Sequence, residues 1–89
     1  MTHIQEWPIQ VWITEEDDRT TARAVLNTRD NVLTADGVAR RSPRDPAVPE
    51  IGDEIAVGRA LAELGRQLLA SGADDVAAIE QPRRSEQPR

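Results

Sequence analysis

The chain has 89 residues, enough for one domain, and it contains no cysteine, which excludes disulfides and thiolate metal sites. Its formal net charge of -5 argues against strong sequence-independent attraction to nucleic-acid phosphates. The first residues lack the basic start and apolar run of a signal peptide, and no apolar run approaches membrane-spanning length. We therefore expect a cytoplasmic protein without membrane contact.

The first predicted element is a strand near the N-terminus. Apolar residues alternate with others from Trp7 to Ile13, which is the period of a half-buried strand. Pro8 predicts either an edge position or a strand that begins just after it. The acidic run 15–18 is expected to form the following turn, because it lacks the alternating ligands and central glycine of a calcium loop.

Two more strands are predicted, over residues 20–27 and 32–40, with a turn at 29–31 between them. Apolar and small residues recur at every second position, so that each strand has one apolar face. These positions are Ala22, Ala24, Leu26, Leu33, Ala35, Gly37 and Ala39. The small side chains of the third strand indicate that another element approaches it closely.

A helix is predicted over roughly 52–70. Three prolines exclude regular structure between residues 41 and 52. Asp53 and Glu54 suit the positive start of a helix, and Ser71-Gly72 supplies a stop. A short second helix is predicted over 74–80, and the polar tail 81–89 is expected to be disordered.

These elements predict an α+β fold: a three-stranded antiparallel sheet followed by a long helix and a short C-terminal helix (β-β-β-α-α). Residues 1–80 form its single domain. A monomer of this size buries only ~60–65% of the unfolded chain's surface, so we expect the fold to be completed as a homodimer.

Two apolar stripes run along the predicted helix. The first is expected to be core and consists of Val57, Leu61, Leu64 and Leu68. The second contains Gly58, Ala62 and Gly65, and it has two interpretations: a flat seat against the small face of the third strand, or a contact with a partner subunit. The opposite side, with Arg59, Glu63 and Arg66, has the spacing of a solvated face.

Catalytic constellations are nearly absent from the sequence. The only histidine is His3, and no serine lies in a nucleophile-elbow motif. Neither Gly-rich phosphate motif is present. The sequence therefore predicts a non-enzymatic protein with no cofactor, no metal and no small-molecule substrate.

The sheet face away from the helix is the better candidate for binding. Six arginines fall between residues 19 and 44, against Asp30 and Asp36. The predicted RNA-binding or ribosome-binding residues are Trp12, Arg23, Arg40, Arg41 and Arg44, because an aromatic ring stacks on bases and guanidinium groups hold phosphates. Two other interpretations stay open: Trp12 stacks on Arg23 as a cation-π pair, or a dimer covers this face.

One set of residues carries a family resemblance. It comprises Gly37-Val38-Ala39-Arg40 with Pro43, Val48-Pro49-Glu50-Ile51-Gly52-Asp53-Glu54-Ile55, and Arg59-Ala60-Leu61 with Leu64-Gly65. The chain resembles an actinobacterial family of small proteins with a domain of unknown function, related to a dormancy-associated mycobacterial protein. The resemblance implies a β-β-β-α fold with a further helical piece, a homodimer, and similarity in fold to ribosome hibernation promoting factors and double-stranded-RNA-binding-like domains. It also marks the start of the helix as a motif, namely Val48, Pro49, Glu50, Ile51, Gly52 and Asp53.

Two functional hypotheses follow. The first is a stress or dormancy protein that binds ribosomes or structured RNA and restrains translation. The second is a dimeric protein-interaction module whose acidic residues Glu50, Asp53 and Glu54 meet a basic partner protein. A structural role is the alternative for the motif: Pro49 ends the loop, Gly52 permits a tight start and Asp53 favours the helix.

Overall fold

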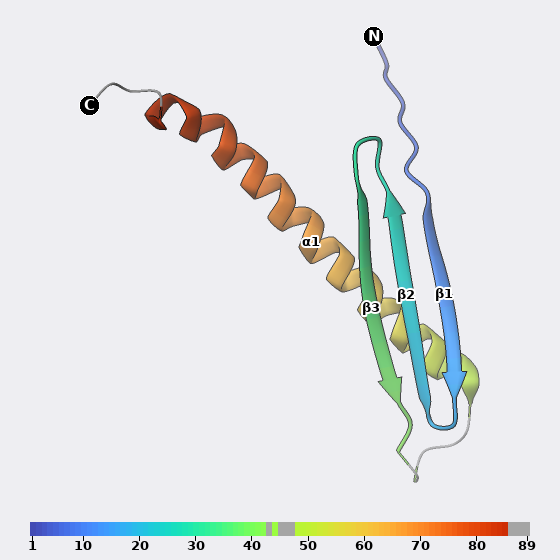
Figure 1. The fold of residues 1–89 in the computed structure, drawn as a ribbon. Coiled ribbons are helices and arrows are strands. Elements are labelled where there is room, and N and C mark those ends of the chain that lie inside the picture. Colours follow the sequence, from blue (N-terminus) through green and yellow to red (C-terminus); the bar gives the residue numbers. More distant parts are fainter. Residues whose placement is uncertain (43, 45–47, 86–89) are drawn as a thin grey trace.

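The computed structural model describes residues 1–42, 44 and 48–85, without the side chains of 80–85. Its elements are β1 (Ile9–Glu16), β2 (Arg19–Asn27), β3 (Val32–Arg40) and α1 (Pro49–Ser85) (Figure 1). The strands form one antiparallel sheet in the order β1-β2-β3. This confirms the predicted three-stranded sheet followed by a long helix. The helical stretch described does not combine the length and apolar character needed to span a bilayer.

Two hairpins connect the strands and set the register of the sheet. In the first, Glu16 pairs with Arg19, so the turn consists of Asp17 and Asp18. The prediction that the whole run 15–18 forms the turn was therefore wrong, because a two-residue connection extends β1 through Glu16. Asp17 has a φ of 53°, a left-handed conformation that aspartate tolerates and two-residue hairpins need.

The helix begins earlier and ends later than predicted. Pro49 is its first residue, where a proline's fixed φ is favourable and its missing N–H is not needed. The carbonyl of Val48 accepts the amide of Ile51 at 3.1 Å, which closes the first turn.

The predicted stop at Ser71-Gly72 was also wrong. No described glycine has a positive φ, so Gly72 continues the helix instead of ending it. Residues 74–80, predicted as a separate helix, are consequently part of α1, where Ala77 and Ala78 are strong helix formers. The helix passes the predicted domain boundary at residue 80 and continues to Ser85, while residues 86–89 of the predicted tail lie outside the described residues.

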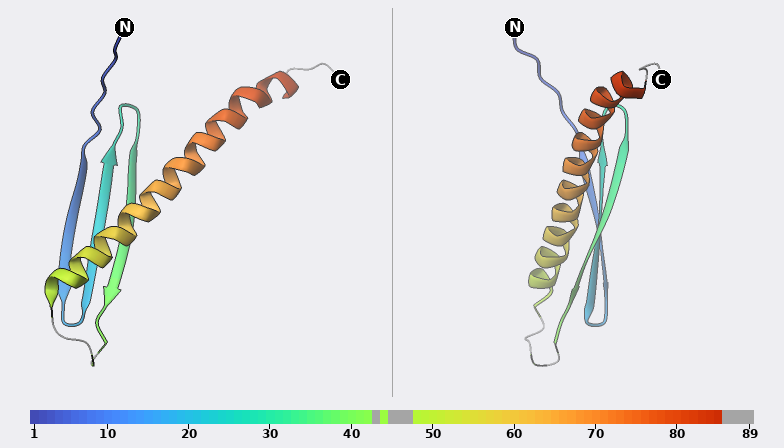
Figure 2. Two further views of the ribbon diagram at one scale, coloured as in Figure 1. Left: turned by 180° about the vertical axis from the view of Figure 1, so that it is seen from behind. Right: turned by 90° about the vertical axis from the view of Figure 1, so that its left-hand side faces the viewer.

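The molecule has two layers, the sheet and one helix laid diagonally across a single face. The left view in Figure 2 shows α1 crossing the strands and then projecting past the sheet, and the right view shows that the helix lies on one side of the sheet. The buried core is built mainly of alanine, together with two leucines: Ala22, Ala24, Leu26, Ala35, Ala39, Ala56, Ala60 and Leu64. Because alanine buries little apolar area, this core is small for a chain of this length.

The sheet seats the helix through Ala56 and Ala60 and not through the predicted stripe of Gly58, Ala62 and Gly65. Gly58 and Ala62 are exposed, and a Cβ atom at Gly58 or Gly65 would meet nothing within 4 Å. The interpretation of that stripe as a seat for this sheet was therefore wrong, because it faces away from β3. A contact with a partner subunit stays a prediction.

The predicted core stripe is only partly correct. Leu64 is buried, and Val57 and Leu68 are half-buried against the core, but Leu61 is 40% exposed. The helix is rotated about its own axis so that Ala56 and Ala60 face the sheet, because these small side chains allow the closest approach to β3. This rotation leaves Leu61 partly exposed to solvent.

Candidate functional site

A cleft of about 440 Å³ lies where the start of α1 meets the β1–β2 hairpin and the end of β3. Four motif residues from the sequence line it, namely Val48, Pro49, Ile51 and Gly52, together with Arg40 and Arg41. The remaining lining residues are Glu15, Asp17, Asp18, Thr20, Ala39 and Ile55. The fold thus brings the family motif at the helix start next to two of the arginines predicted to bind RNA.

The floor of this cleft is apolar. Val48, Ile51 and Ile55 are between 42% and 52% exposed, although each belongs to a residue type that is usually buried. Gly52 lets the helix approach β2, because a Cβ atom there would lie only 2.9 Å from the Thr20 hydroxyl oxygen. The predicted structural role of Gly52 in a tight helix start agrees with this contact.

Two carboxyl groups meet beside the cleft, Glu15 from β1 and Asp53 from α1. The Glu15 pKa is raised above its ordinary value, first because its side chain shares a hydrogen bond with Asp53, and then because the two negative charges repel. The Asp53 Oδ1 atom is buried and has no hydrogen-bond partner among the described residues. A protonated Glu15 would supply a donor to this carboxylate pair. Glu15 was not among the predicted site residues, since no pattern in the sequence indicates that residues 15 and 53 lie close together.

Arg41 belongs to the cleft and not to the outer sheet face. Its Nη2 donates to Asp18 Oδ1 at 2.6 Å, and its backbone amide donates to the Asp18 carbonyl oxygen at 2.8 Å. These bonds fasten the end of β3 to the β1–β2 hairpin. The Arg41 charge is thereby balanced within the chain.

The outer sheet face contains Trp12 and Arg23, as predicted. The register aligns Trp12, Arg23 and Asp36 across the three strands. Arg23 donates from Nε to Asp36 Oδ1 at 2.9 Å and from Nη2 to Oδ2 at 3.2 Å, a two-pronged ion pair that lowers the Asp36 pKa. The RNA-binding hypothesis needs the positive charge of Arg23 for contact with phosphates. In the structure, the carboxylate of Asp36 already balances this charge.

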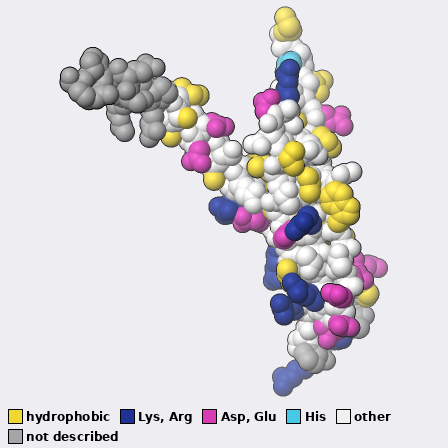
Figure 3. All heavy atoms as spheres, in the orientation of Figure 1, with side chains coloured by type: hydrophobic (Ala, Val, Ile, Leu, Met, Phe, Trp, Pro, Cys, Tyr) yellow, Lys and Arg dark blue, Asp and Glu magenta, His cyan; other side chains and the backbone are white. Residues whose placement is uncertain are grey.

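The other two arginines of the RNA-binding hypothesis are Arg40, at the end of β3, and Arg44, in the segment after it. Arg40 lies directly opposite Arg19 on the outer face. Arg44 is exposed in the segment after β3, with its amide bonded to the Ser42 hydroxyl at 3.3 Å. In Figure 3, which shows the sheet face away from α1, basic and acidic side chains lie intermixed. The five predicted residues therefore do not form one continuous basic surface.

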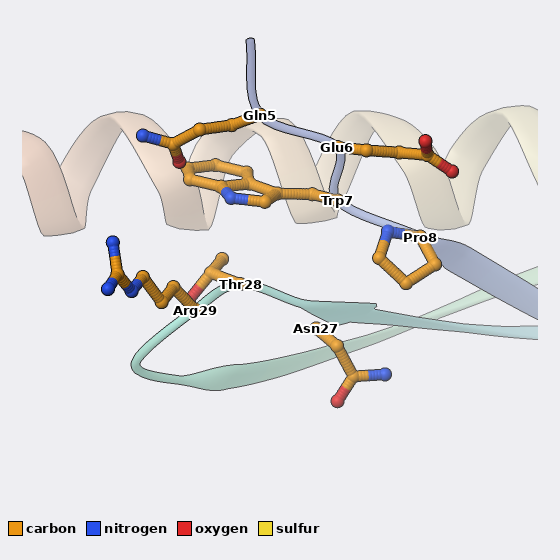
Figure 4. A pocket seen from close by; sticks show the side chains of 7 residues that line it. All are labelled: Gln5, Glu6, Trp7, Pro8, Asn27, Thr28 and Arg29. Carbon is orange, nitrogen blue, oxygen red and sulfur yellow. The ribbon is translucent and has the colours of Figure 1, made fainter. Parts of the chain in front are cut away.

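A second, more open hollow of about 350 Å³ lies between the N-terminal segment and the β2–β3 hairpin. Figure 4 shows Trp7 above the hairpin residues Thr28 and Arg29. The hollow contains Glu6 as its single carboxylate, and the residues that the structure describes form no group of three or more metal-binding side chains. The larger cleft has three carboxylates and four motif residues in its lining, and is therefore the stronger candidate site.

A three-stranded antiparallel sheet covered on one face by a single long helix defines the structural class, a small α+β protein. Within this class, the Rv2632c-like family model matches residues 5–85, and the chain belongs to that family. This match confirms the resemblance seen in the sequence at the level of family membership.

Two of the similar proteins come from mycobacteria. Uncharacterized protein Mb1767 of Mycobacterium bovis is 42% identical over 76 residues, which cover 85% of this chain and 81% of that protein. Uncharacterized protein Rv2632c of Mycobacterium tuberculosis is 43% identical over 70 residues, covering 79% and 75% respectively. The crystal structure of Rv2632c matches with a TM-score of 0.80 at 37% identity, over 99% of this chain and 100% of that one. Dormancy and similarity to hibernation factors stay predictions.

Proposed function

We propose that this protein is a non-enzymatic, homodimeric interaction module whose cleft at the start of α1 binds a basic segment of a partner protein. One observation carries the proposal: the cleft joins exposed apolar side chains to carboxylates in the same surface. A peptide that carries an arginine or lysine next to an aliphatic residue matches both features.

The charge around the cleft favours a cationic partner. Glu15, Asp17 and Asp18 line it on the hairpin side, and three further acids lie in the first two turns of α1, namely Glu50, Asp53 and Glu54. Two basic residues also line the cleft: Arg41 already binds Asp18, and Arg40 occupies an outer-face position of β3 opposite Arg19. A cationic side chain would therefore gain more from this surface than an anionic one.

The apolar floor supplies the second part of the binding energy. Burying Ile51 and Ile55 under an aliphatic side chain removes apolar surface from water, at roughly 25 cal/mol per Å². Carboxylates at the rim would set the orientation of the bound segment. This division between an apolar contact and a few polar ones is usual for peptide-binding sites.

The test is fluorescence anisotropy with a labelled Gly/Ser-rich peptide that carries two arginines and two leucines. We expect Ile51→Ser and Asp17→Asn each to weaken its binding roughly tenfold. The control variant is Glu63→Gln, which makes a matched charge change on α1 away from the cleft. Equal binding of a peptide with glutamates in place of the arginines would refute the proposal.

A second candidate function is the binding of ribosomes or structured RNA, in keeping with the predicted role in stress or dormancy. The observation that favours it is the pair Arg19 and Arg40, which face each other across β2 and β3. Like charges in directly opposed positions destabilise a sheet, so an external anion such as a phosphate would relieve their repulsion.

Co-sedimentation with mycobacterial ribosomes at low and moderate salt tests this candidate. We expect binding to fall steeply with salt and to be lost when Arg19→Glu and Arg40→Glu are combined. Arg66→Glu is the control, because Arg66 lies on α1 and pairs with Glu63 at 2.6 Å. A wild-type protein that stays in the supernatant at low salt would exclude this function.

A further inference from the structure

The helix covers part of one edge strand of the sheet, β3, but hardly contacts the other edge strand, β1. The β3 edge is partly covered, because Arg59 Nη1 donates to the Val38 carbonyl at 2.7 Å and Gln67 Nε2 donates to the Thr34 carbonyl at 3.1 Å. The sequence predicted that Arg59 lies on a solvated face of the helix. That prediction was wrong for Arg59, because its side chain bonds to the backbone of β3. Among the described residues, no helix side chain bonds to the β1 edge in this way, and α1 contacts β1 only slightly.

The outward backbone groups of β1 follow from its pairing with β2. The Pro8 carbonyl accepts the Asn27 amide at 3.2 Å, so the even-numbered residues of β1 bond to β2. The backbone N–H and C=O groups of the odd-numbered residues consequently point away from the sheet. These residues are Ile9, Val11, Ile13 and Glu15.

This edge has few of the features by which proteins protect a free strand, and its charged residues, Glu15 and Glu16, lie together at one end of β1. Between residues 9 and 16 there is no proline, no lysine and no bulge, since the pairing with β2 is uninterrupted. The side chains around it are apolar and uncovered: Ile9 is 48% exposed, Trp12 53% and Ile13 45%. An exposed strand with these properties is a template for a further strand.

We propose that the β1 edge binds the β1 edge of a second copy of this chain, antiparallel and about a two-fold axis at Trp12, to give a continuous six-stranded sheet. The inference rests on the homodimer in the proposed function and assigns its interface. Binding in the cleft is a separate property and is measured separately.

The pairing is self-complementary. With Trp12 opposite Trp12 of the second copy, Ile9 lies opposite Glu15 and Val11 opposite Ile13. Every outward N–H and C=O group of the four odd-numbered residues then has a partner. A shift of the axis to Val11 or Ile13 would leave some of these groups unpaired within β1.

The charges also select this arrangement. The acids of β1, Glu15 and Glu16, lie at one end of the strand, and an antiparallel partner places uncharged Ile9 and Pro8 opposite them. A parallel partner would bring the same acids together, which is unfavourable. The two-fold arrangement also pairs the β1 edges of both copies at once, because a two-fold interface is closed.

The interface would cover apolar surface that the small alanine core leaves exposed. Ile9, Val11 and Ile13 share the helix side of β1, and pairing two copies would place both sets in one strip between the two α1 helices. The need for this cover is clear from the core, which contains Leu26 and Leu64 as its larger buried side chains among the described residues.

Crosslinking tests the register directly, because the natural chain has no cysteine. Opposed residues in such a non-hydrogen-bonded pair have Cα atoms about 4.5 Å apart, within the range of a disulfide. Trp12→Cys should therefore form a covalent dimer under mild oxidation. Gln10→Cys is the matched control on the same strand and face, because its two copies would be displaced by roughly 13 Å. Equal crosslinking of both variants would overturn the proposed register.

Oligomeric state tests the interface. The wild-type chain should be a dimer in light scattering, and Ile13→Lys should weaken the dimer by more than about tenfold, because a charged residue protects a strand edge. Val32→Lys makes the same kind of change on exposed β3 and should leave the dimer intact. A monomeric wild-type protein, or a dimer broken by Val32→Lys and not by Ile13→Lys, would refute the β1 interface. Failure of peptide binding with an intact dimer would refute only the cleft.

Discussion

Gly37 of β3 lies directly under the backbone of Ala56 on α1. A Cβ atom at Gly37 would collide with the Ala56 carbonyl oxygen and the Ala60 amide nitrogen. Both contacts are with backbone atoms, which cannot rotate away as the end of a side chain can. The distance between the two layers is therefore set by the absence of a single side chain.

We expect Gly37→Ala to destabilise the protein by about 1–3 kcal/mol, the usual cost of overpacking a well-packed interface. Urea unfolding followed by circular dichroism measures the change. Ala35→Gly is not a suitable control because it alters the core, so Thr34→Ala on the exposed face of the same strand is compared. Unchanged stability of Gly37→Ala would contradict the close contact between β3 and α1.

Gly72 provides a test of the continuous helix. Because its φ is not positive and its Cβ position is open, Gly72→Ala should stabilise α1 by up to about 1 kcal/mol and raise its helical content. A glycine that ended the helix in the left-handed conformation would give the opposite sign. Thermal melts of the wild type and the variant at 222 nm distinguish the two.

Leu64 is the largest of the three side chains that α1 contributes to the buried core, the others being Ala56 and Ala60. We expect Leu64→Ala to cost about 2–5 kcal/mol, through lost burial and the cavity left behind. Leu69→Ala makes the same chemical change at a side chain that is 79% exposed, and should have little effect on the stability of the isolated subunit. Equal losses for both variants would mean that Leu69 is covered in the assembled protein.

The pairing of Glu15 with Asp53 predicts a pH dependence of stability. Since the Glu15 pKa is raised in the folded state, the folded protein binds the proton more tightly than the unfolded chain does. The stabilising contribution is present below the ordinary pKa of 4.5 and is lost as the pH rises through the raised value.

Glu15→Gln should therefore be more stable than the wild type at neutral pH, and the difference should shrink in acid. The variant keeps a hydrogen-bond donor for Asp53 at every pH. Glu16→Gln is the control, because its side chain lies on the other face of β1. Melting temperatures across the acidic range give the result, and a constant difference at all pH values would contradict it.

The opposite sign applies to Glu63. Its pKa is lowered from 4.5 to about 2, because Arg66 and then Gln67 donate hydrogen bonds to its carboxylate. Its contribution to stability is present above 4.5 and lost as the pH falls toward the lowered value. A carbon-detected NMR titration should show this low pKa, and Arg66→Gln should raise it.

The sequence by itself determined the three strands, their faces and the presence of a long helix. In β2, Ala22, Ala24 and Leu26 occupy every second position, and this alternation indicates which side of the strand is buried, because side chains in a strand point to opposite faces in turn. The small residues of β3 likewise predicted that another element packs closely against this strand. The motif around Pro49 and Gly52 marked the start of the helix.

Only the tertiary structure decided what covers each surface. The hydrophobic pattern of α1 is broad enough to admit several rotations, and the contact of Ala56 with Gly37 selects the one that leaves Leu61 and Gly58 outside. The partners of Arg23, Arg41 and Glu15 lie 13 to 38 residues away along the chain, in elements that folding brings together. Local periodicity records which residues prefer burial, whereas the choice of neighbour depends on long-range packing, which has no signature in a single sequence.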